Sequence, residues 1–129
     1  MVQFFKSDEK GLKEQMGFSE NGIIYVTNPT QDETRMLSSL LNFEPDFITD
    51  PLDLDERARI DFDDHATEII IKVPYKDEED VKITYKTIPL GIVIGENFVL
   101  FISRHRVPFL ESMIERSQLD PNKRSRMIF

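Results

Sequence analysis

The sequence contains no cysteine, and this absence excludes several classes of chemistry. Disulfide bonds, zinc sites with thiolate ligands, iron–sulfur clusters and thiol catalysis all depend on cysteine sulfur. Long apolar runs are absent as well. No window approaches the roughly 18 apolar residues of a membrane span, and residues 1–14 lack the apolar stretch of a signal peptide. The 129 residues are therefore expected to form one soluble domain.

Basic side chains are also few. The chain has 16 Lys and Arg against 24 Asp and Glu, for a formal net charge of −8. No basic face is visible before the last few residues. Proteins bind nucleic acids and anionic membrane surfaces by neutralising phosphates, so neither is an expected partner. Cations and basic protein surfaces are favoured instead.

Acidic residues are abundant in the chain and are concentrated in residues 43–64. Against two arginines, this segment carries nine carboxylates: Glu44, Asp46, Asp50, Asp53, Asp55, Glu56, Asp61, Asp63 and Asp64. Two unit charges ~4 Å apart repel by roughly 1 kcal/mol in water and by about 4 kcal/mol at an effective dielectric near 20. A divalent cation would relieve this repulsion, and oxygen ligands suit Mg²⁺ or Ca²⁺.

Capping and proline signals mark the helices. Thr30 and Glu33 match a capping box, which together with the apolar spacing predicts a helix over 31–42. Pro108 begins another helix. A similar proline signal at Asp120-Pro121 predicts a further helix that runs to the apolar end of the chain, which we interpret as the start of an additional element.

A short helix is predicted inside the acidic segment. Pro45 suits its first turn, and Pro51 should end or bend it near Asp50, because proline lacks a backbone N–H. Asp46 lies four residues before Asp50, so both carboxylates are expected on one face of this helix.

Alternating and apolar runs predict a sheet. Strands are expected at 2–6, 23–26, 58–63, 67–73, 81–88, 90–94 and 98–102, with 11–14 as a hairpin arm. In the strand over 58–63, Ala58, Ile60 and Phe62 should face the core and the carboxylates should face water. Hairpins combined with one strand–helix–helix–strand crossover indicate an α/β domain whose mixed sheet has helices packed on it.

Three segments, taken in order, resemble the N-terminal cytoplasmic domain of the CorA family of magnesium and cobalt transporters. The first is 26–30 with the capping-box helix that follows, the second runs from 45–50 to 57–60, and the third is 87–94 with its hairpin to 99–102. The resemblance extends from about Val2 to the end of the chain. It implies a three-layer α/β/α domain with a mixed, largely antiparallel sheet and short flanking helices.

The resemblance also implies a division of the chain and a setting for it. Residues 1–118 would be the α/β domain, and 119–129 the start of a stalk helix leading to two membrane spans. The parent would be a homopentamer at the cytoplasmic face of the inner membrane. The spans and the family's Gly-Met-Asn signature are not in this sequence. The chain would then be a regulatory domain that neither conducts ions nor acts as an enzyme.

In that family, a carboxylate at the end of the short helix faces the neighbouring subunit's stalk, and divalent metal between them favours the closed channel. Asp50 matches this position, with Thr49 where related proteins often carry a second carboxylate and Pro51 in place of an apolar residue. The resemblance thus implies weak regulatory binding of Mg²⁺, or of Co²⁺. This chain would supply only half of the metal site, and the neighbouring subunit would supply the other half. Asp46 and Asp53 are further metal candidates.

Two other functions stay open on the residues alone. The acidic segment could serve a metal-dependent hydrolase that works with paired carboxylates. It could equally be the docking face of a protein-interaction module for a basic partner. His65 and His105 have no ligand-like neighbours at metal spacing, so neither predicts a metal site.

Overall fold

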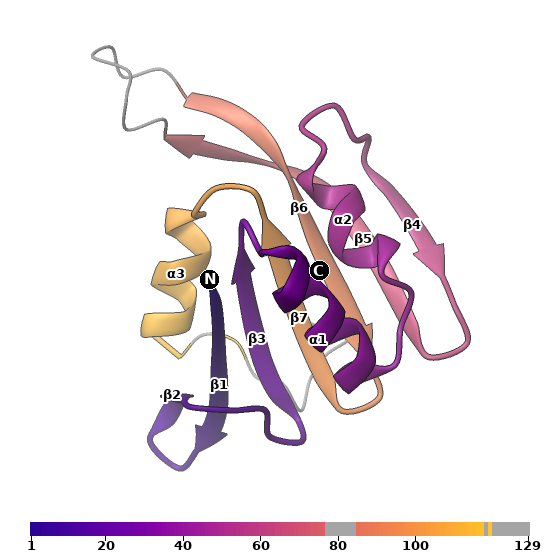
Figure 1. Cartoon of the computed structure of the whole chain (residues 1–129). Coiled ribbons are helices and arrows are strands. Elements are labelled where there is room, and N and C mark those ends of the chain that lie inside the picture. The colour runs from indigo at the N-terminus through magenta and orange to yellow at the C-terminus, as the bar shows by residue number, and fades with distance from the viewer. Residues whose placement is uncertain (77–84, 118, 120–129) are drawn as a thin grey trace.

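The computed structural model describes residues 1–76, 85–117 and 119 of the chain (Figure 1). The strands are β1 (Val2–Asp8), β2 (Gly11–Gln15), β3 (Gly22–Thr27), β4 (Arg59–Phe62), β5 (Ala66–Lys76), β6 (Tyr85–Gly95) and β7 (Phe98–Ser103). The helices are α1 (Gln31–Leu41), α2 (Asp46–Thr49), the 3₁₀ helix η1 (Asp50–Leu52) and α3 (Pro108–Glu115). The predicted stalk start at 119–129 lies outside the described residues apart from Leu119, which is buried.

The seven strands form one sheet in the order β2-β1-β3-β7-β6-β5-β4. Only β3 and β7 pair in parallel, and every other neighbouring pair is antiparallel. The parallel pair arises because the chain crosses over through α1, α2 and the β4–β5–β6 meander before it returns beside β3. The mixed, largely antiparallel α/β sheet predicted from the sequence is confirmed.

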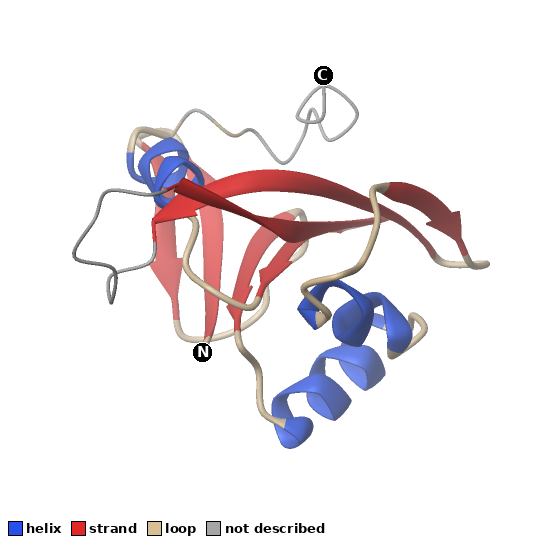
Figure 2. Cartoon of the chain, turned by 90° about the horizontal axis from the view of Figure 1, so that it is seen from above, coloured by secondary structure: helices blue, strands red, loops and turns tan. Residues whose placement is uncertain are grey.

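Helices cover both faces of this sheet, which gives three layers (Figure 2). Leu110 and Ile114 of α3 pack on one face, where they share an apolar core with Ile23 and Phe101. The opposite face packs against α1 and α2, and its core includes Leu37, Leu41, Phe43, Phe47 and Ile48 together with Ile24, Leu100 and Ile102. The predicted three-layer α/β/α architecture is therefore confirmed.

The capping box at the start of α1 forms as predicted. The N–H of Glu33 donates to Oγ1 of Thr30 at 3.1 Å, and the N–H of Thr30 donates to Oε1 of Glu33 at 2.9 Å. These two bonds satisfy backbone donors that the first helical turn leaves free. The helix ends at Leu41, and Asn42 follows in the left-handed conformation with φ 56°.

The short helix in the acidic segment also forms where it was predicted. The N–H of Asp50 donates to the carbonyl oxygen of Asp46, so the helical turn reaches Asp50. There α2 tightens into η1, which contains Pro51. The ring of Pro51 is buried against Gly91 of β6, where a side-chain Cβ would overlap it. Close approach at this glycine places the end of α2 directly on the sheet.

Two strand predictions were wrong. Ile60 and Phe62 of β4 do not face the core, because their side chains are 61% and 71% exposed. Alternation identifies two faces of a strand but does not say which one is covered. The predicted break between 81–88 and 90–94 is also absent, since β6 runs continuously from Tyr85 to Gly95 and Pro89 lies opposite Lys72 of β5.

Candidate functional site

A single guanidinium gathers the carboxylates around the end of α2. Nη2 of Arg59 lies 2.6 Å from Oδ2 of Asp50, and Nε lies 3.1 Å from Oε1 of Glu56. Nη1 lies 3.2 Å from Oδ2 of Asp61. Arginine presents several N–H donors in one plane, so it can hold three carboxylates at once. The hydrogen bonds that Arg59 donates to Glu56 and Asp50 raise the pKa of Arg59, which stays protonated.

The fourth carboxyl group, that of Glu68, is fully buried. Glu68 lies on β5 directly opposite Asp61 of β4, so both side chains share the face of the sheet that meets η1. Its Oε1 is 3.6 Å from Nη2 of Arg59, too far for a hydrogen bond. Neither of its oxygens has a hydrogen-bond partner among the described residues. We call Asp50, Glu56, Arg59, Asp61 and Glu68 the Arg59 cluster.

Burial controls the protonation of Glu68. Removal from water disfavours the charged form and raises the pKa of Glu68 to about 8, although the charge of Arg59 opposes this shift. The negative charges of Asp50, Asp61 and Glu56 raise the pKa further. At neutral pH the buried carboxyl group is therefore mostly neutral, and the other three carboxylates share the guanidinium.

Asp50 was predicted to face a neighbouring subunit. In the structure it is 33% exposed and its Oδ2 is bonded to Arg59. The guanidinium already supplies positive charge at the position where a cation would approach this oxygen. Any cation at Asp50 must therefore compete with Arg59.

The two further metal candidates lie apart from this pairing. Asp46 and Asp53 are both exposed. Oδ1 of Asp53 accepts the N–H of Asp55 at 3.0 Å, which fixes the turn after η1. In the described part of the chain, no group of three or more His, Cys, Asp or Glu side chains is placed to hold a metal ion.

Asp63 has a structural role in the turn between β4 and β5. Its Oδ1 accepts the N–H groups of His65 and Ala66, both at 2.7 Å, and its Oδ2 accepts the N–H of Glu44 at 3.0 Å. Burial favours a higher pKa for Asp63, but these three hydrogen bonds outweigh it and lower the pKa. Asp63 therefore ties the acidic loop to the hairpin, although it also lines a shallow hollow of about 320 Å³ with Asp64 and His65.

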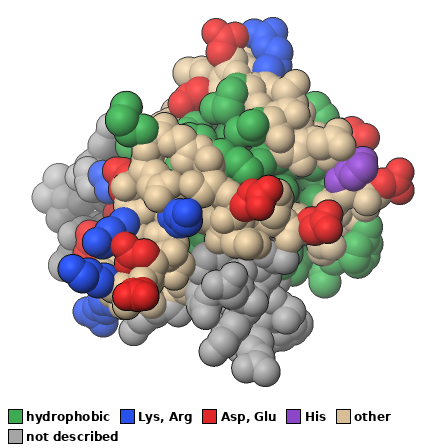
Figure 3. Space-filling model, turned by 90° about the horizontal axis from the view of Figure 1, so that it is seen from below, with side chains coloured by type: hydrophobic (Ala, Val, Ile, Leu, Met, Phe, Trp, Pro, Cys, Tyr) green, Lys and Arg blue, Asp and Glu red, His purple; other side chains and the backbone are tan. Residues whose placement is uncertain are grey.

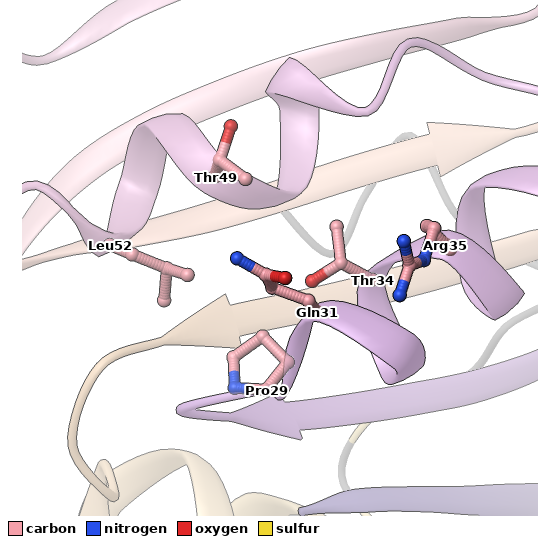
Figure 4. A pocket seen from close by; sticks show the side chains of 6 residues that line it. All are labelled: Pro29, Gln31, Thr34, Arg35, Thr49 and Leu52. Carbon is pink, nitrogen blue, oxygen red and sulfur yellow. The ribbon is translucent and has the colours of Figure 1, made fainter.

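A second shallow pocket lies between the start of α1 and α2–η1 (Figure 4). It has a volume of about 320 Å³ and is lined by Pro29, Gln31, Thr34, Arg35, Thr49 and Leu52. No carboxylate lines it, so it offers a cation no charged oxygen. Figure 3 shows one face of the molecule, on which acidic side chains lie scattered among other types instead of gathering in one patch.

Sequence reasoning missed the central pair of the Arg59 cluster. Arg59 was interpreted as one of two bases in an acidic segment, and Glu68 as a member of a strand. The available signal was the position of Glu68, directly before the apolar run Ile69-Ile70-Ile71 of the central strand. A charged residue next to such a run is either exposed to water or buried with a partner. Nothing local identifies that partner as Arg59.

Known structures share this fold. The complete structure of the CorA magnesium transporter from Methanocaldococcus jannaschii matches 92% of this chain with a TM-score of 0.71 and 22% identity. The structure of the soluble domain of CorA from the same organism matches 94% with a TM-score of 0.72 and 23% identity. The chain covers 38% and 48% of these two proteins, less than half of either. A search of curated proteins found no match.

In the part of the chain that the structure describes, no helix is both long and apolar enough to cross a membrane.

Comparison with protein-family models identifies the family. A family model described as "CorA-like Mg2+ transporter protein" matches residues 21–128, most of the chain. The chain therefore belongs to the CorA-like Mg²⁺ transporter family.

Proposed function

We propose that this chain is the regulatory, cation-sensing domain of a CorA-like transporter of divalent cations, Mg²⁺ or Co²⁺. The observation that carries the proposal is the family match over residues 21–128, which includes strands β3 to β7 and the acidic segment. The parent protein would be a homopentamer, with this domain at the cytoplasmic face of the inner membrane. In this role the chain binds its ligand without chemical turnover.

Electrostatic repulsion between subunits supplies the mechanism. Asp50 would face a carboxylate of the next subunit, and at low cation concentration the two charges would push the subunits apart. A bridging Mg²⁺ ion would stabilise the closed arrangement, because it binds that state more tightly than the open one. Mg²⁺ gives up its water reluctantly, so a site with few protein ligands is weak and responds at millimolar concentrations.

Arg59 sets the threshold of this sensor. Its guanidinium is 2.6 Å from Oδ2 of Asp50 and lowers the negative potential that a cation would meet. The same bond fixes the carboxylate at the end of α2, so its direction does not depend on the cation. A sensor with a built-in competitor requires a higher cation concentration than an unpaired carboxylate would.

A chimeric transporter tests the proposal. This chain would replace the matching domain of the M. jannaschii CorA transporter, and Mg²⁺ uptake would be measured in vesicles at low and high internal Mg²⁺. We expect high internal Mg²⁺ to suppress uptake, and Asp50→Asn to weaken that suppression several-fold. Asp32→Asn, at an exposed carboxylate in the first turn of α1, is the matched control. Equal suppression in all three proteins would contradict the role of Asp50.

The two alternatives from the sequence gain no specific support. Arg59 donates hydrogen bonds to Asp50, Glu56 and Asp61, and backbone N–H groups donate to Asp53 and Asp63. Paired carboxylates for hydrolysis would need to converge on a pocket with free oxygens. An acidic docking face would need its charges directed outward and unpaired.

A further inference from the structure

An apolar patch lies on the sheet face that α3 shares. Besides the exposed Ile60 and Phe62 of β4, Ile71 of the adjacent β5 is 36% exposed. Ile60 lies opposite Ile69, and Ile71 lies two residues further along β5, so these side chains share one face of the sheet. Ile69 packs against the apolar core beneath α3, which identifies the face. We call Ile60, Phe62, Ile69 and Ile71 the β4–β5 patch.

The helix α3 is too small to cover this face of the sheet. Its eight residues form a helix about 12 Å long and about 10 Å wide. Seven strands about 4.8 Å apart span about 29 Å. The opposite face carries α1, α2 and η1 (Figure 2). Among the described residues no second helix packs on the α3 face, so β4 and β5 leave room there for a further segment.

The chain itself enters this face after α3. The end of α3 is held by Ser117, whose Oγ accepts the N–H of Leu12 at 2.9 Å. Two residues later, Leu119 is 5% exposed and belongs to the same apolar core as Ile23 and Phe101. Residues 120–129, which lie outside the described part of the chain, therefore follow directly from a residue buried on the α3 face.

The length of this segment matches the distance to the patch. Leu12, the partner of Ser117, lies on β2, and the five strand spacings from β2 to β5 measure about 24 Å. Ten residues span about 15 Å as a helix and about 33 Å as an extended chain. Residues 120–129 can therefore reach the β4–β5 patch without leaving the surface of the sheet.

The composition of the segment suits the same position. Its last three residues, 127–129, are all apolar. Between Asp120 and this apolar run, Lys123, Arg124 and Arg126 give the segment a positive charge, whereas the whole chain carries a net charge of −8. The rest of the chain therefore attracts the segment, and the apolar run can cover apolar surface once it is there.

We propose that residues 120–129 dock on the β4–β5 patch of their own chain, with the apolar run 127–129 against Ile60 and Ile69. Covalent attachment selects this occupant over a separate molecule. A short tether holds a segment at an effective concentration in the millimolar range, so even a weak apolar contact is mostly formed.

This contact would lie directly behind the Arg59 cluster. On β4, Arg59 and Asp61 face α2 and η1, and the alternate residues Ile60 and Phe62 face the docked segment. In a cation-sensing parent protein, a change at the cluster would reach the segment through one four-residue strand. That consequence rests on the proposed function. The docking itself does not, and its tests use no cation, so their failure would leave cation sensing untouched.

Cysteine cross-linking tests the docking, because the chain has no cysteine of its own. Ile60→Cys combined with Ile128→Cys should form a disulfide within one chain on oxidation. We expect this at least ~10-fold faster than for Leu40→Cys combined with Ile128→Cys, since Leu40 is similarly exposed but lies on α1, across the sheet. Mass spectrometry of digests distinguishes disulfides within a chain from those between chains. Equal rates for the two pairs, or disulfides only between chains, would overturn the proposal.

Hydrogen exchange gives an independent test. Ile128→Lys combined with Phe129→Lys should uncover the patch, so the amides of β4 and β5 should exchange at least ~10-fold faster than in the unmodified chain. Met36→Lys combined with Leu40→Lys adds the same charge at exposed apolar residues of α1 and should leave those rates unchanged. Circular dichroism should show that both variants are folded. Unchanged exchange in the Ile128 and Phe129 variant would contradict the docking.

Discussion

The buried carboxyl group of Glu68 lies 3.6 Å from the guanidinium of Arg59, close enough for attraction but too far for a hydrogen bond. Arg59 directs its hydrogen bonds to Asp50, Glu56 and Asp61. Glu68 is fully buried and no donor in the described part of the chain reaches its oxygens, so protonation reduces the cost of its burial. Four acids and one base at the end of α2 give this region of the domain its own pH dependence.

Glu68 should make the domain less stable as pH rises. Its pKa is about 8 in the folded chain against 4.5 for a glutamate exposed to water, so between these values the folded state binds the extra proton. The stabilisation is complete below 4.5, falls through the interval and is gone above 8. The free energy of unfolding should therefore fall by up to about 1.4 kcal/mol per pH unit.

The isosteric variant Glu68→Gln provides the control for this prediction. It cannot titrate at this position, so its denaturation midpoint should fall less from about pH 6 to about pH 8.5 than that of the wild type. Both proteins keep His65 and His105, so the difference between the two curves isolates the effect of Glu68. Parallel curves for the two proteins would show that Glu68 is ionised in the folded state throughout.

Removal of the central base should destabilise the end of α2. Arg59→Gln leaves Asp50, Glu56 and Asp61 without their shared partner, and we expect urea denaturation to show a loss of about 1–3 kcal/mol. This loss of stability is smaller than the loss expected on breaking a fully buried ion pair, because Arg59 is partly exposed. Arg35→Gln, which breaks an exposed pair with Asp32, should cost less than about 0.5 kcal/mol.

The same variant should move the titration of Glu68. The positive charge of Arg59 lowers the pKa of Glu68, so Arg59→Gln should shift the pH-dependent loss of stability to higher pH. An unchanged pH profile would mean that the two groups do not interact in solution.

Local rules were enough for the elements that depend on neighbours in sequence. The Thr30–Glu33 capping box defines the start of α1, and Pro51 marks the end of α2 near Asp50. Apolar runs predicted most of the strands, because such runs are normally buried in the core. The mixed sheet followed from the order of hairpins and one crossover.

The errors and omissions concern long-range packing. The alternation of apolar and charged residues over 58–63 is compatible with burial of either face of the strand. In the structure, Arg59 contacts Asp50 of η1 and Glu68 of β5, so the charged face is the one that is covered. Asp50 was correctly placed at a helix end, but its partner lies nine residues further along, across a turn. Glu68 stands opposite Asp61 only because of the β4–β5 register. No spacing rule in a single sequence contains that information.

A methyl group at Gly91 should loosen η1. A Cβ there would lie 2.8 Å from Cγ2 of Ile102 and would overlap the ring of Pro51. Overpacking of this kind commonly costs about 1–3 kcal/mol, so Gly91→Ala should lower the denaturation midpoint and weaken amide protection in η1. Gly17→Ala is the matched control, since nothing lies within 4 Å of its Cβ position. Equal midpoints for the two variants would argue against the Gly91–Pro51 contact.

Mg²⁺ should bind this chain weakly, and Arg59 should be part of the reason. If Asp50 supplies half of a shared site, calorimetry should give an affinity no tighter than millimolar, and NMR shifts on titration should centre on Asp50. Asp50→Asn should remove those shifts, whereas Asp32→Asn should not. Arg59→Gln should strengthen binding several-fold, because a competing guanidinium 2.6 Å from Oδ2 of Asp50 is lost. Micromolar affinity in the unmodified chain would mean that one chain holds a complete site, contrary to a site shared between subunits.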